Sequence, residues 1–316
     1  MAYRLETIGN DRSEELREHC SHLNYHTGKA DINGICIALY TENRDYIEMW
    51  TDNFYHMSDS VRSHARIFCL SDPSADLHAE YDTATRTMFL FNFDYYGWIK
   101  SIALGMAGNI LEDSHSTYSV HGAALEMDGV GVTIIAPSKT GKTTQSWGLL
   151  RGGRAHLITD DWYFVQFGRG RPWAEGSEKN CYIDADIGDV WEEYRPLARE
   201  VRFDNKGRGI GNIRWVAGPD SVVRGARMGC ILLLKRDPAD PPGIVEMPSD
   251  DAYAYLRDNG FCNPHQLVFD APRVRRREEF FRRYTSECET FMVNTSGTPE
   301  ETQAAIRKVL SSRCGL

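Results

Sequence analysis

The sequence predicts an α/β protein in which a mixed sheet with flanking helices is preceded by a smaller α+β region. Three observations predict this. An apolar strand pattern runs into a phosphate-binding loop motif at residues 136–144, and a helical pattern follows that loop. Two adjacent aspartates end the next strand pattern. The chain has 316 residues, which favours two domains, and we place the boundary between residues 1–115 and residues 116–316.

The first region combines short apolar runs with longer amphipathic ones. Strand-like runs cover residues 34–40, 65–70 and 87–93, and helical patterns cover residues 13–20 and 95–111. The order of these runs predicts an α+β module, which we expect to recognise a substrate or partner.

The second region begins near residue 116 with a strand pattern over residues 118–127. Asp128-Gly129 predicts a tight hairpin turn, because both central positions of a type I′ turn need positive φ. The return strand at residues 131–135 leads into the loop. A helix over residues 143–150 ends at Gly152-Gly153, and a strand at residues 156–159 follows.

The rest of the chain is loop-rich and then mostly helical. A glycine-rich segment at residues 207–211 precedes a buried strand at residues 229–234. Helical patterns cover residues 249–259, 273–289 and 299–311, and a short strand at residues 290–294 lies before the last helix. The C-terminal part of the second domain is therefore expected to be helical.

Composition excludes several classes of function. The net charge of −9 does not favour a nucleic-acid partner, since such proteins usually carry a basic excess. None of the eight cysteines forms a C-x-x-C pair, so we expect buried thiols in a reducing compartment, with no disulfide framework and no zinc site. No apolar run is long enough to span a membrane, and the first residues lack a signal-peptide pattern, so we expect a cytoplasmic protein with no membrane partner.

The strongest motif is the segment that we call the phosphate loop, residues 136–144. It matches the pattern G-x-x-x-x-G-K-[ST], except that Ala136 replaces the first glycine. Its strand–loop–helix context argues against a simple linker. The candidate residues for binding a nucleotide or its phosphates are Ser138, Lys139, Thr140, Gly141, Lys142, Thr143 and Thr144.

Each residue type has a chemical reason. Gly141 lets the chain turn so that successive backbone N–H groups face one concavity, and the following helix adds its own free N–H groups. Lys142 brings a positive charge to the β- and γ-phosphates, and Thr143 offers a hydroxyl to Mg²⁺. The sequence therefore predicts a site for Mg²⁺ and a nucleotide such as ATP.

The aspartates Asp160 and Asp161 follow the strand at residues 156–159, which we expect to lie parallel to the phosphate-loop strand and beside it. Phosphoryl transfer needs one carboxylate for the metal and one group to orient the attacking hydroxyl. Both aspartates are candidate catalytic residues with Lys142, and Asp161 is a candidate metal ligand with Thr143. The sequence does not divide the two tasks between the aspartates. A helix cap or turn is the structural alternative for such a pair.

Together these segments resemble the catalytic domain of HPr kinase/phosphorylase and its relatives, which share a core with phosphoenolpyruvate carboxykinases. The resemblance covers residues 116–235 and depends on four segments of this chain. They are Val120-His121-Gly122-Ala123, the phosphate loop, Ile158-Thr159-Asp160-Asp161, and the Gly-rich segment from Asp204 to Ile213. It implies an HPr kinase/carboxykinase-like mixed sheet and a closed homo-oligomer.

The resemblance also implies roles for residues outside the loop. His121 would be a catalytic residue near the phosphates, and Asp204 a second acidic ligand of Mg²⁺. Lys206 and Arg208 would hold phosphate or substrate. Asp204 stands where the family has Glu, and Lys206 stands where it has Arg.

We therefore expect a Mg²⁺-dependent kinase that transfers a phosphoryl group to a hydroxyl of a small molecule or to a Ser of a peptide or protein. The resemblance also allows reverse phosphorolysis. A carboxykinase-type lyase and a non-catalytic nucleotide-binding sensor are the alternatives. Neither the acceptor nor the donor (ATP, ADP, GTP or pyrophosphate) is determined by the sequence.

Overall fold

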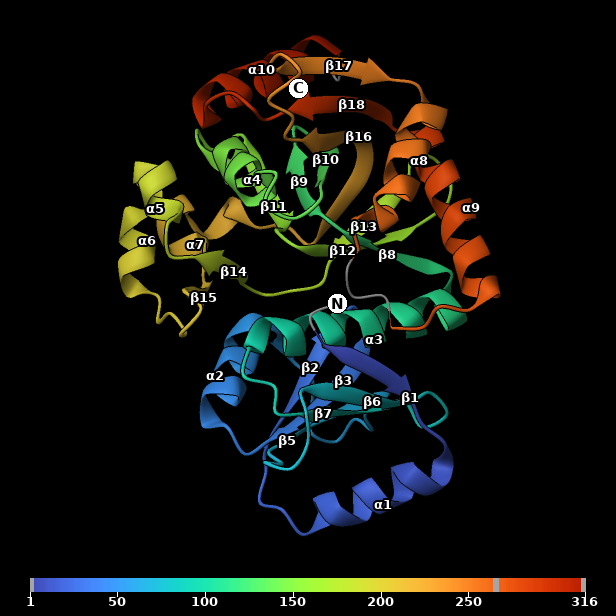
Figure 1. The fold of residues 1–316 in the computed structure, drawn as a ribbon. Coiled ribbons are helices and arrows are strands. Elements are labelled where there is room, and N and C mark those ends of the chain that lie inside the picture. The colour runs from blue at the N-terminus through green and yellow to red at the C-terminus, as the bar shows by residue number, and fades with distance from the viewer. Residues whose placement is uncertain (1–2, 264–266, 314–316) are drawn as a thin grey trace. The chain divides into compact units, whose positions relative to one another are not determined.

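The computed structural model describes residues 3–263 and 267–313, which form two compact units (Figure 1). The first unit contains residues 3–115 together with Leu267, and the second contains residues 116–263 and 268–313. The division between the units lies near residue 115, and the function expected for the first unit stays a prediction.

The first unit is built on a mixed seven-stranded sheet in the order β1-β6-β7-β5-β3-β2-β4. Strands β3, β5 and β7 are parallel, whereas β2 pairs with β3 in antiparallel sense. The strands are β1 (Arg4–Thr7), β2 (His26–Ile32), β3 (Ile35–Thr41), β4 (Tyr55–His56), β5 (Ala65–Leu70), β6 (His78–Asp82) and β7 (Thr87–Phe91).

Three helices pack on this sheet. In α1 (Asn10–Ser21), Leu16 and Cys20 belong to one buried hydrophobic cluster with Phe89 and Phe91 of β7. Helices α2 (Arg44–Asn53) and α3 (Tyr96–His115) lie against β2, β3 and β5. The Asn43 side chain caps α2 by accepting a hydrogen bond from the Asp45 N–H.

The second unit contains a nine-stranded mixed sheet. Its main order is β11-β9-β10-β16-β13-β12-β8, and β18 pairs with both β16 and β17. The strands are β8 (Thr117–His121), β9 (Ala123–Met127), β10 (Val130–Ile135), β11 (Ala155–Thr159), β12 (Trp162–Gln166), β13 (Trp173–Gly176), β16 (Gly225–Lys235), β17 (Gly243–Met247) and β18 (Glu289–Asn294). A separate two-stranded sheet joins β14 (Cys181–Asp184) and β15 (Arg208–Gly211).

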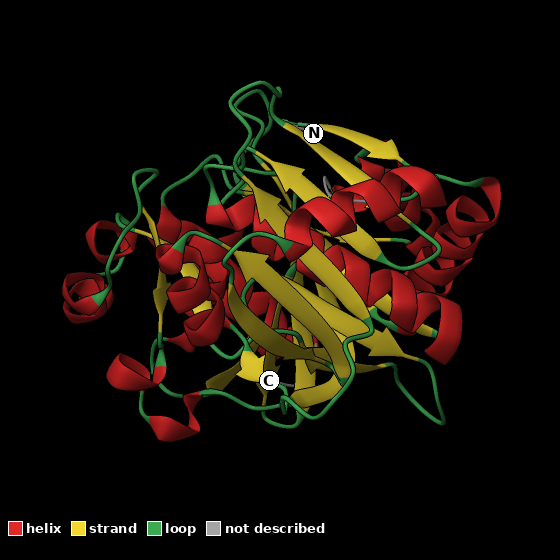
Figure 2. Ribbon diagram, turned by 90° about the horizontal axis from the view of Figure 1, so that it is seen from below, coloured by secondary structure: helices red, strands yellow, loops and turns green. Residues whose placement is uncertain are grey.

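Helices cover both faces of this sheet (Figures 1 and 2). Alternation along β16 shows how: Leu232 and Leu234 belong to a core with Trp147 of α4, whereas Ile231 and Leu233 belong to a core with Phe281 of α9. The helices are α4 (Lys142–Leu150), α5 (Ile187–Val190), α6 (Arg195–Glu200), α7 (Arg214–Ala217), α8 (Ser249–Asp258), α9 (Ala271–Glu287) and α10 (Pro299–Arg313), with short 3₁₀ turns η1 (Glu192–Tyr194), η2 (Pro219–Ser221) and η3 (Gly260–Cys262).

The structure corrects two strand predictions. The run over residues 118–127 is two strands, because the chain changes partners at Gly122: β8 pairs with β12, and β9 pairs with β10. A side chain at Gly122 would lie 2.8 Å from the Ile134 carbonyl oxygen, so only glycine fits this crossing. The strand before the aspartates, β11, is also not beside β10, since β9 lies between them.

The predicted hairpin turn is confirmed, and the cysteines and helices are characterised for the residues that the structure covers. Asp128 and Gly129 both have positive φ in the hairpin turn between β9 and β10. The seven described cysteines are buried, and Cys314 lies outside the described residues. Among the residues that the structure describes, no helix combines the length and the apolar character needed to cross a membrane.

Candidate functional site

The phosphate loop connects β10 to α4. Lys139 and Gly141 have φ angles of 66° and 96°, so the chain bends twice through the left-handed region before the helix begins at Lys142. The Thr140 hydroxyl donates to the Pro137 carbonyl over 2.7 Å, which holds the bend. Ser138 and Lys139 are exposed. The loop thus has the shape in which backbone N–H groups and the N-terminus of a helix bind anions.

Lys142 contacts the aspartate pair beyond the carboxyl ends of β10 and β11. Its Nζ donates to Asp161 Oδ1 over 2.6 Å and to the Asp160 carbonyl oxygen over 3.1 Å. Both side chains are mostly buried, with 14% of Lys142 and 24% of Asp161 exposed. Such a partly buried pair is screened less by water than a surface pair and holds the lysine beside the loop.

His121 approaches the same carboxylate from β8. Its Nε2 lies 3.1 Å from Asp161 Oδ1, and its Nδ1 lies 2.5 Å from the Cys262 carbonyl oxygen. A carbonyl oxygen only accepts hydrogen bonds, so Nδ1 carries a hydrogen. Asp161 Oδ1 is therefore within hydrogen-bond distance of both the Lys142 ammonium group and the His121 imidazole.

The topology explains why these residues meet. The chain changes from β8 to β9 at Gly122 and from β11 to β12 at Asp160-Asp161, and these crossings touch through a 2.8 Å hydrogen bond from the Gly122 N–H to the Asp161 carbonyl oxygen. His121 pairs with Trp162 in the strand register. The Asp160 side chain is only 3% exposed at this crossing.

The predicted substrate loop has a local structure of its own. Asp204 Oδ1 accepts hydrogen bonds from the N–H groups of Lys206 and Arg208, and Asp204 Oδ2 accepts one from the Tyr182 hydroxyl. The Asp204 carboxylate therefore stabilises a turn. This role differs from the magnesium-ligand role that the resemblance implies. The ligand role is untested, and the turn role makes the opposite expectation, which the Asp204→Asn variant decides.

Arg208 also has a local partner. Its Nε lies 2.5 Å from Asp184 Oδ1, and its guanidinium lies 5.6 Å from the centre of the Tyr182 ring. Burial raises the pKa of Asp184, although Arg208 acts in the opposite direction. An anionic substrate would have to compete with Asp184 for Arg208. Lys206 is exposed.

Sequence reasoning missed two residues that hold the loop and its helix. The hydroxyl of Thr295, just after β18, donates to the Thr140 carbonyl over 2.8 Å. Arg307 of α10 donates to the carbonyl oxygens of Gly148, Leu149 and Arg151 at the C-terminal end of α4. No local pattern signals either residue, because each acts across more than 150 positions of sequence.

The residues around the loop fit Mg²⁺ better than a metal held by protein alone. No group of three or more His, Cys, Asp or Glu side chains suited to a metal is found among the described residues. Mg²⁺ keeps most of its waters and uses one or two carboxylates together with substrate phosphates. The half-buried Thr143 in the first turn of α4 and the aspartates at the neighbouring crossing match that requirement.

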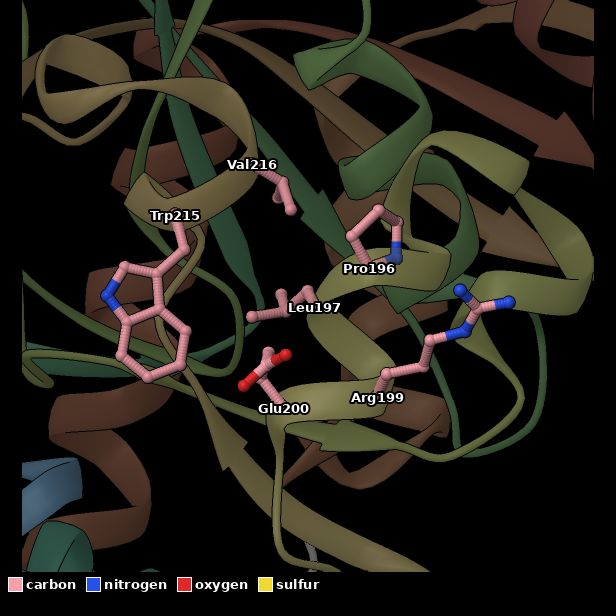
Figure 3. A pocket seen from close by; sticks show the side chains of 6 residues that line it. All are labelled: Pro196, Leu197, Arg199, Glu200, Trp215 and Val216. Atoms are coloured by element: carbon pink, nitrogen blue, oxygen red, sulfur yellow. The ribbon is translucent and has the colours of Figure 1, made fainter.

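A small hollow lies elsewhere in the second unit, between α6 and α7 (Figure 3). Its volume is about 220 Å³, which is less than the ~300 Å³ of a small ligand pocket. The exposed Trp215 forms one wall. The lining residues are Pro196, Leu197, Arg199, Glu200, Trp215 and Val216, and none of them is a predicted site residue.

Comparisons with known proteins add a distant likeness of fold. No family model and no curated protein matches the sequence. Among solved structures, the HPr(Ser) kinase/phosphatase from Coxiella burnetii is similar over 62% of this chain and 93% of its own, with 15% sequence identity and a TM-score of 0.35. A similarity this distant assigns no activity to the chain.

Proposed function

We propose that this chain binds a nucleoside triphosphate with Mg²⁺ on the phosphate loop and transfers its terminal phosphoryl group to a hydroxyl. The acceptor is a small molecule or a Ser of a peptide or protein. The observation that carries the proposal is the contact of Lys142 with Asp161, which brings the loop and the paired aspartates together.

Each residue has a role in this proposal. The N–H groups of the loop and the charge of Lys142 bind the phosphates, and Thr143 with an aspartate holds the ion. Mg²⁺, when bound, neutralises charge on the phosphate oxygens. The contact with His121 favours Asp161 as the group that orients the acceptor hydroxyl. Lys206 and Arg208 are proposed to hold the acceptor.

The transfer balances without a further reactant. The acceptor oxygen forms a bond to the γ-phosphorus, and the bond from that phosphorus to the leaving oxygen breaks. The acceptor proton passes to Asp161, and a nucleoside diphosphate leaves. Positioning and charge stabilisation supply most of the rate in such reactions.

The test combines calorimetric MgATP binding with turnover over a panel of hydroxyl acceptors, for the wild type, Asp160→Asn and Asp161→Asn. We expect micromolar binding that requires Mg²⁺, and turnover that falls at least about 100-fold in Asp161→Asn. Tight binding without transfer to any acceptor or to water would favour a sensor. Release of carbon dioxide from oxaloacetate would favour a lyase.

A further inference from the structure

We propose that the turn η3, residues Gly260–Cys262, is a positioning element of the phosphate site: its last carbonyl holds the His121 ring so that Nε2 faces Asp161. This inference rests on the proposed function. Cys262 lies 141 positions after His121 in the sequence, and no motif connects the two. Cys262 touches no reacting atom in this proposal and acts only through the histidine.

The contact selects one arrangement of the ring. The Cys262 carbonyl accepts from Nδ1 over 2.5 Å, so the hydrogen of that bond belongs to Nδ1. Nε2 then faces Asp161 Oδ1 at 3.1 Å, and a hydrogen bond there needs a further hydrogen on Nε2 or on the carboxyl group, because a bare ring nitrogen and a carboxylate oxygen both only accept. Without the carbonyl, the ring can turn about χ2, and Nε2 would then no longer face Asp161.

The backbone of the turn adopts a left-handed conformation at the residues that lead to this contact. Gly260, Phe261 and Cys262 have φ angles of 58°, 53° and 54°, so three consecutive residues are left-handed. Two of them carry side chains, for which this conformation is unfavourable. Strained backbone persists only where its surroundings enforce it, and such positions cluster at functional sites.

Packing enforces the turn from two sides. The Phe261 ring stacks on Phe281 of α9 with centroids 4.6 Å apart and planes 4° apart. The Cys262 N–H donates to the Asn259 carbonyl over 3.0 Å, which closes the turn onto the end of α8. The Cys262 side chain is buried, and burial raises the pKa of its thiol to about 12, with Lys142 close enough to oppose the rise. These contacts hold the turn in place, so that the Cys262 carbonyl stays directed at His121.

Gly260→Ala tests the turn without a steric clash. An added Cβ at Gly260 meets no atom within 4 Å, so the substitution penalises only the left-handed conformation. Gly129→Ala is the matched control, since Gly129 also has positive φ and open space, and it lies at the opposite end of β10 from the phosphate loop.

The main readout is the ¹⁵N NMR signal of the two ring nitrogens of His121, assigned by its loss in His121→Gln. We expect the wild type to show a hydrogen-bonded N–H at Nδ1, as in Gly129→Ala, and Gly260→Ala to lose that signal. The kcat of MgATP hydrolysis should fall about tenfold in Gly260→Ala with an unchanged KM, because the loop itself is intact.

Two further variants keep the inference testable if Gly260→Ala folds poorly. Phe261→Leu keeps an apolar side chain but removes the ring stack, and it should shift the ring signals part of the way. His121→Asn places an amide N–H where Nδ1 stood, so it should keep the bond to Cys262 and lose the contact with Asp161, with kcat as low as in His121→Gln.

The outcomes separate this inference from the proposed function. A wild-type ring without a hydrogen on Nδ1, or a Gly260→Ala protein that matches Gly129→Ala in ring signals and kcat, overturns the positioning role. A wild type that hydrolyses no MgATP and transfers to no acceptor, but shows the expected ring signals and their loss in Gly260→Ala, overturns the kinase proposal and leaves the positioning role standing.

Discussion

Lys142 Nζ donates to Asp161 Oδ1 over 2.6 Å, although the two residues lie 19 positions apart in different parts of the second unit. Lys142 is the first residue of α4, and Asp161 lies at the crossing from β11 to β12. The same carboxylate oxygen also faces His121 Nε2 at 3.1 Å. Asp161 is therefore the common partner of the phosphate loop and of β8.

Lys142→Met should abolish nucleotide binding. The substitution removes the charge expected at the phosphates and the ammonium group that donates to Asp161. We expect the Kd for MgATP in titration calorimetry to rise at least about 100-fold. Lys308→Met, an exposed lysine of α10, is the control and should bind as the wild type does. Equal affinity in the two variants would contradict the proposed phosphate site.

Thr295→Val should loosen the phosphate loop. The variant keeps the shape of the side chain but removes the hydroxyl that donates to the Thr140 carbonyl. Loss of one buried hydrogen bond should lower the free energy of unfolding by about 1 kcal/mol and weaken MgATP binding about fivefold. Thr290→Val, at the other end of β18, removes a hydroxyl bonded to the Cys288 carbonyl. If both variants weaken binding equally, the hydroxyl of Thr295 has no specific role at the loop.

Arg307→Met should destabilise α4 at its C-terminal end. The guanidinium donates to three carbonyl oxygens there. Burial lowers its pKa, so these hydrogen bonds offset the free energy that burying the charge costs. We expect unfolding to become easier by about 2 kcal/mol in denaturant titrations, while Lys308→Met stays within about 0.5 kcal/mol of the wild type. An unchanged midpoint in Arg307→Met would show that water replaces the guanidinium at the helix end.

Asp204→Asn should leave the magnesium requirement almost unchanged. Asparagine keeps the oxygen that accepts from Lys206 and Arg208, so the turn survives while the negative charge is lost. We expect the Mg²⁺ concentration for half-maximal turnover to change less than about threefold. Removal of a true ligand charge would raise it about tenfold or more, and that result would restore Asp204 as a metal ligand.

The first unit should lose stability in acid through Glu80. Burial alone would raise its pKa, but hydrogen bonds from Arg12 and His78 outweigh burial and lower the pKa below 4.5. A lowered pKa stabilises the folded state above pH 4.5, and this contribution is lost as the pH falls through the folded-state value. Amide hydrogen exchange in β6 and β7 should therefore accelerate as the pH falls below this value. The measured rates are first corrected for the pH dependence of intrinsic exchange.

Glu80→Gln removes this dependence, because the amide does not titrate. The variant should exchange faster than the wild type at pH 7 and show a flatter response towards acid. Glu15→Gln is the control, since Glu15 pairs with the same Arg12 at 3.5 Å on the exposed surface of α1. A wild-type profile in Glu80→Gln would assign the acid response to other groups.

Local patterns predicted the elements that carry the phosphate loop, and for clear reasons. Residues 143–150 were expected as a helix and form most of α4, because the loop glycine and the Gly152-Gly153 pair mark both ends. The run at residues 65–70 coincides with β5. The hairpin at Asp128-Gly129 depends on two positive φ angles, which the sequence signals directly.

Strand neighbours were not predictable in the same way. An apolar run from residue 118 to 127 looks like one strand, since nothing local shows that Gly122 passes 2.8 Å from the Ile134 carbonyl oxygen. The hairpin places β9 beside β10, but β11 pairs with β9 and not with β10 because β16, from a distant part of the chain, occupies the other side of β10.

By itself, the sequence determined that a phosphate loop follows one strand and that two acids follow another, because glycine conformation and apolar periodicity act over a few residues. Only the tertiary structure decided that Asp161 meets Lys142 and His121, that Asp204 closes its own turn, and that the Cys262 carbonyl holds the imidazole. Those contacts join residues far apart in the chain, and they form only when packing of the two cores brings distant segments within hydrogen-bond distance.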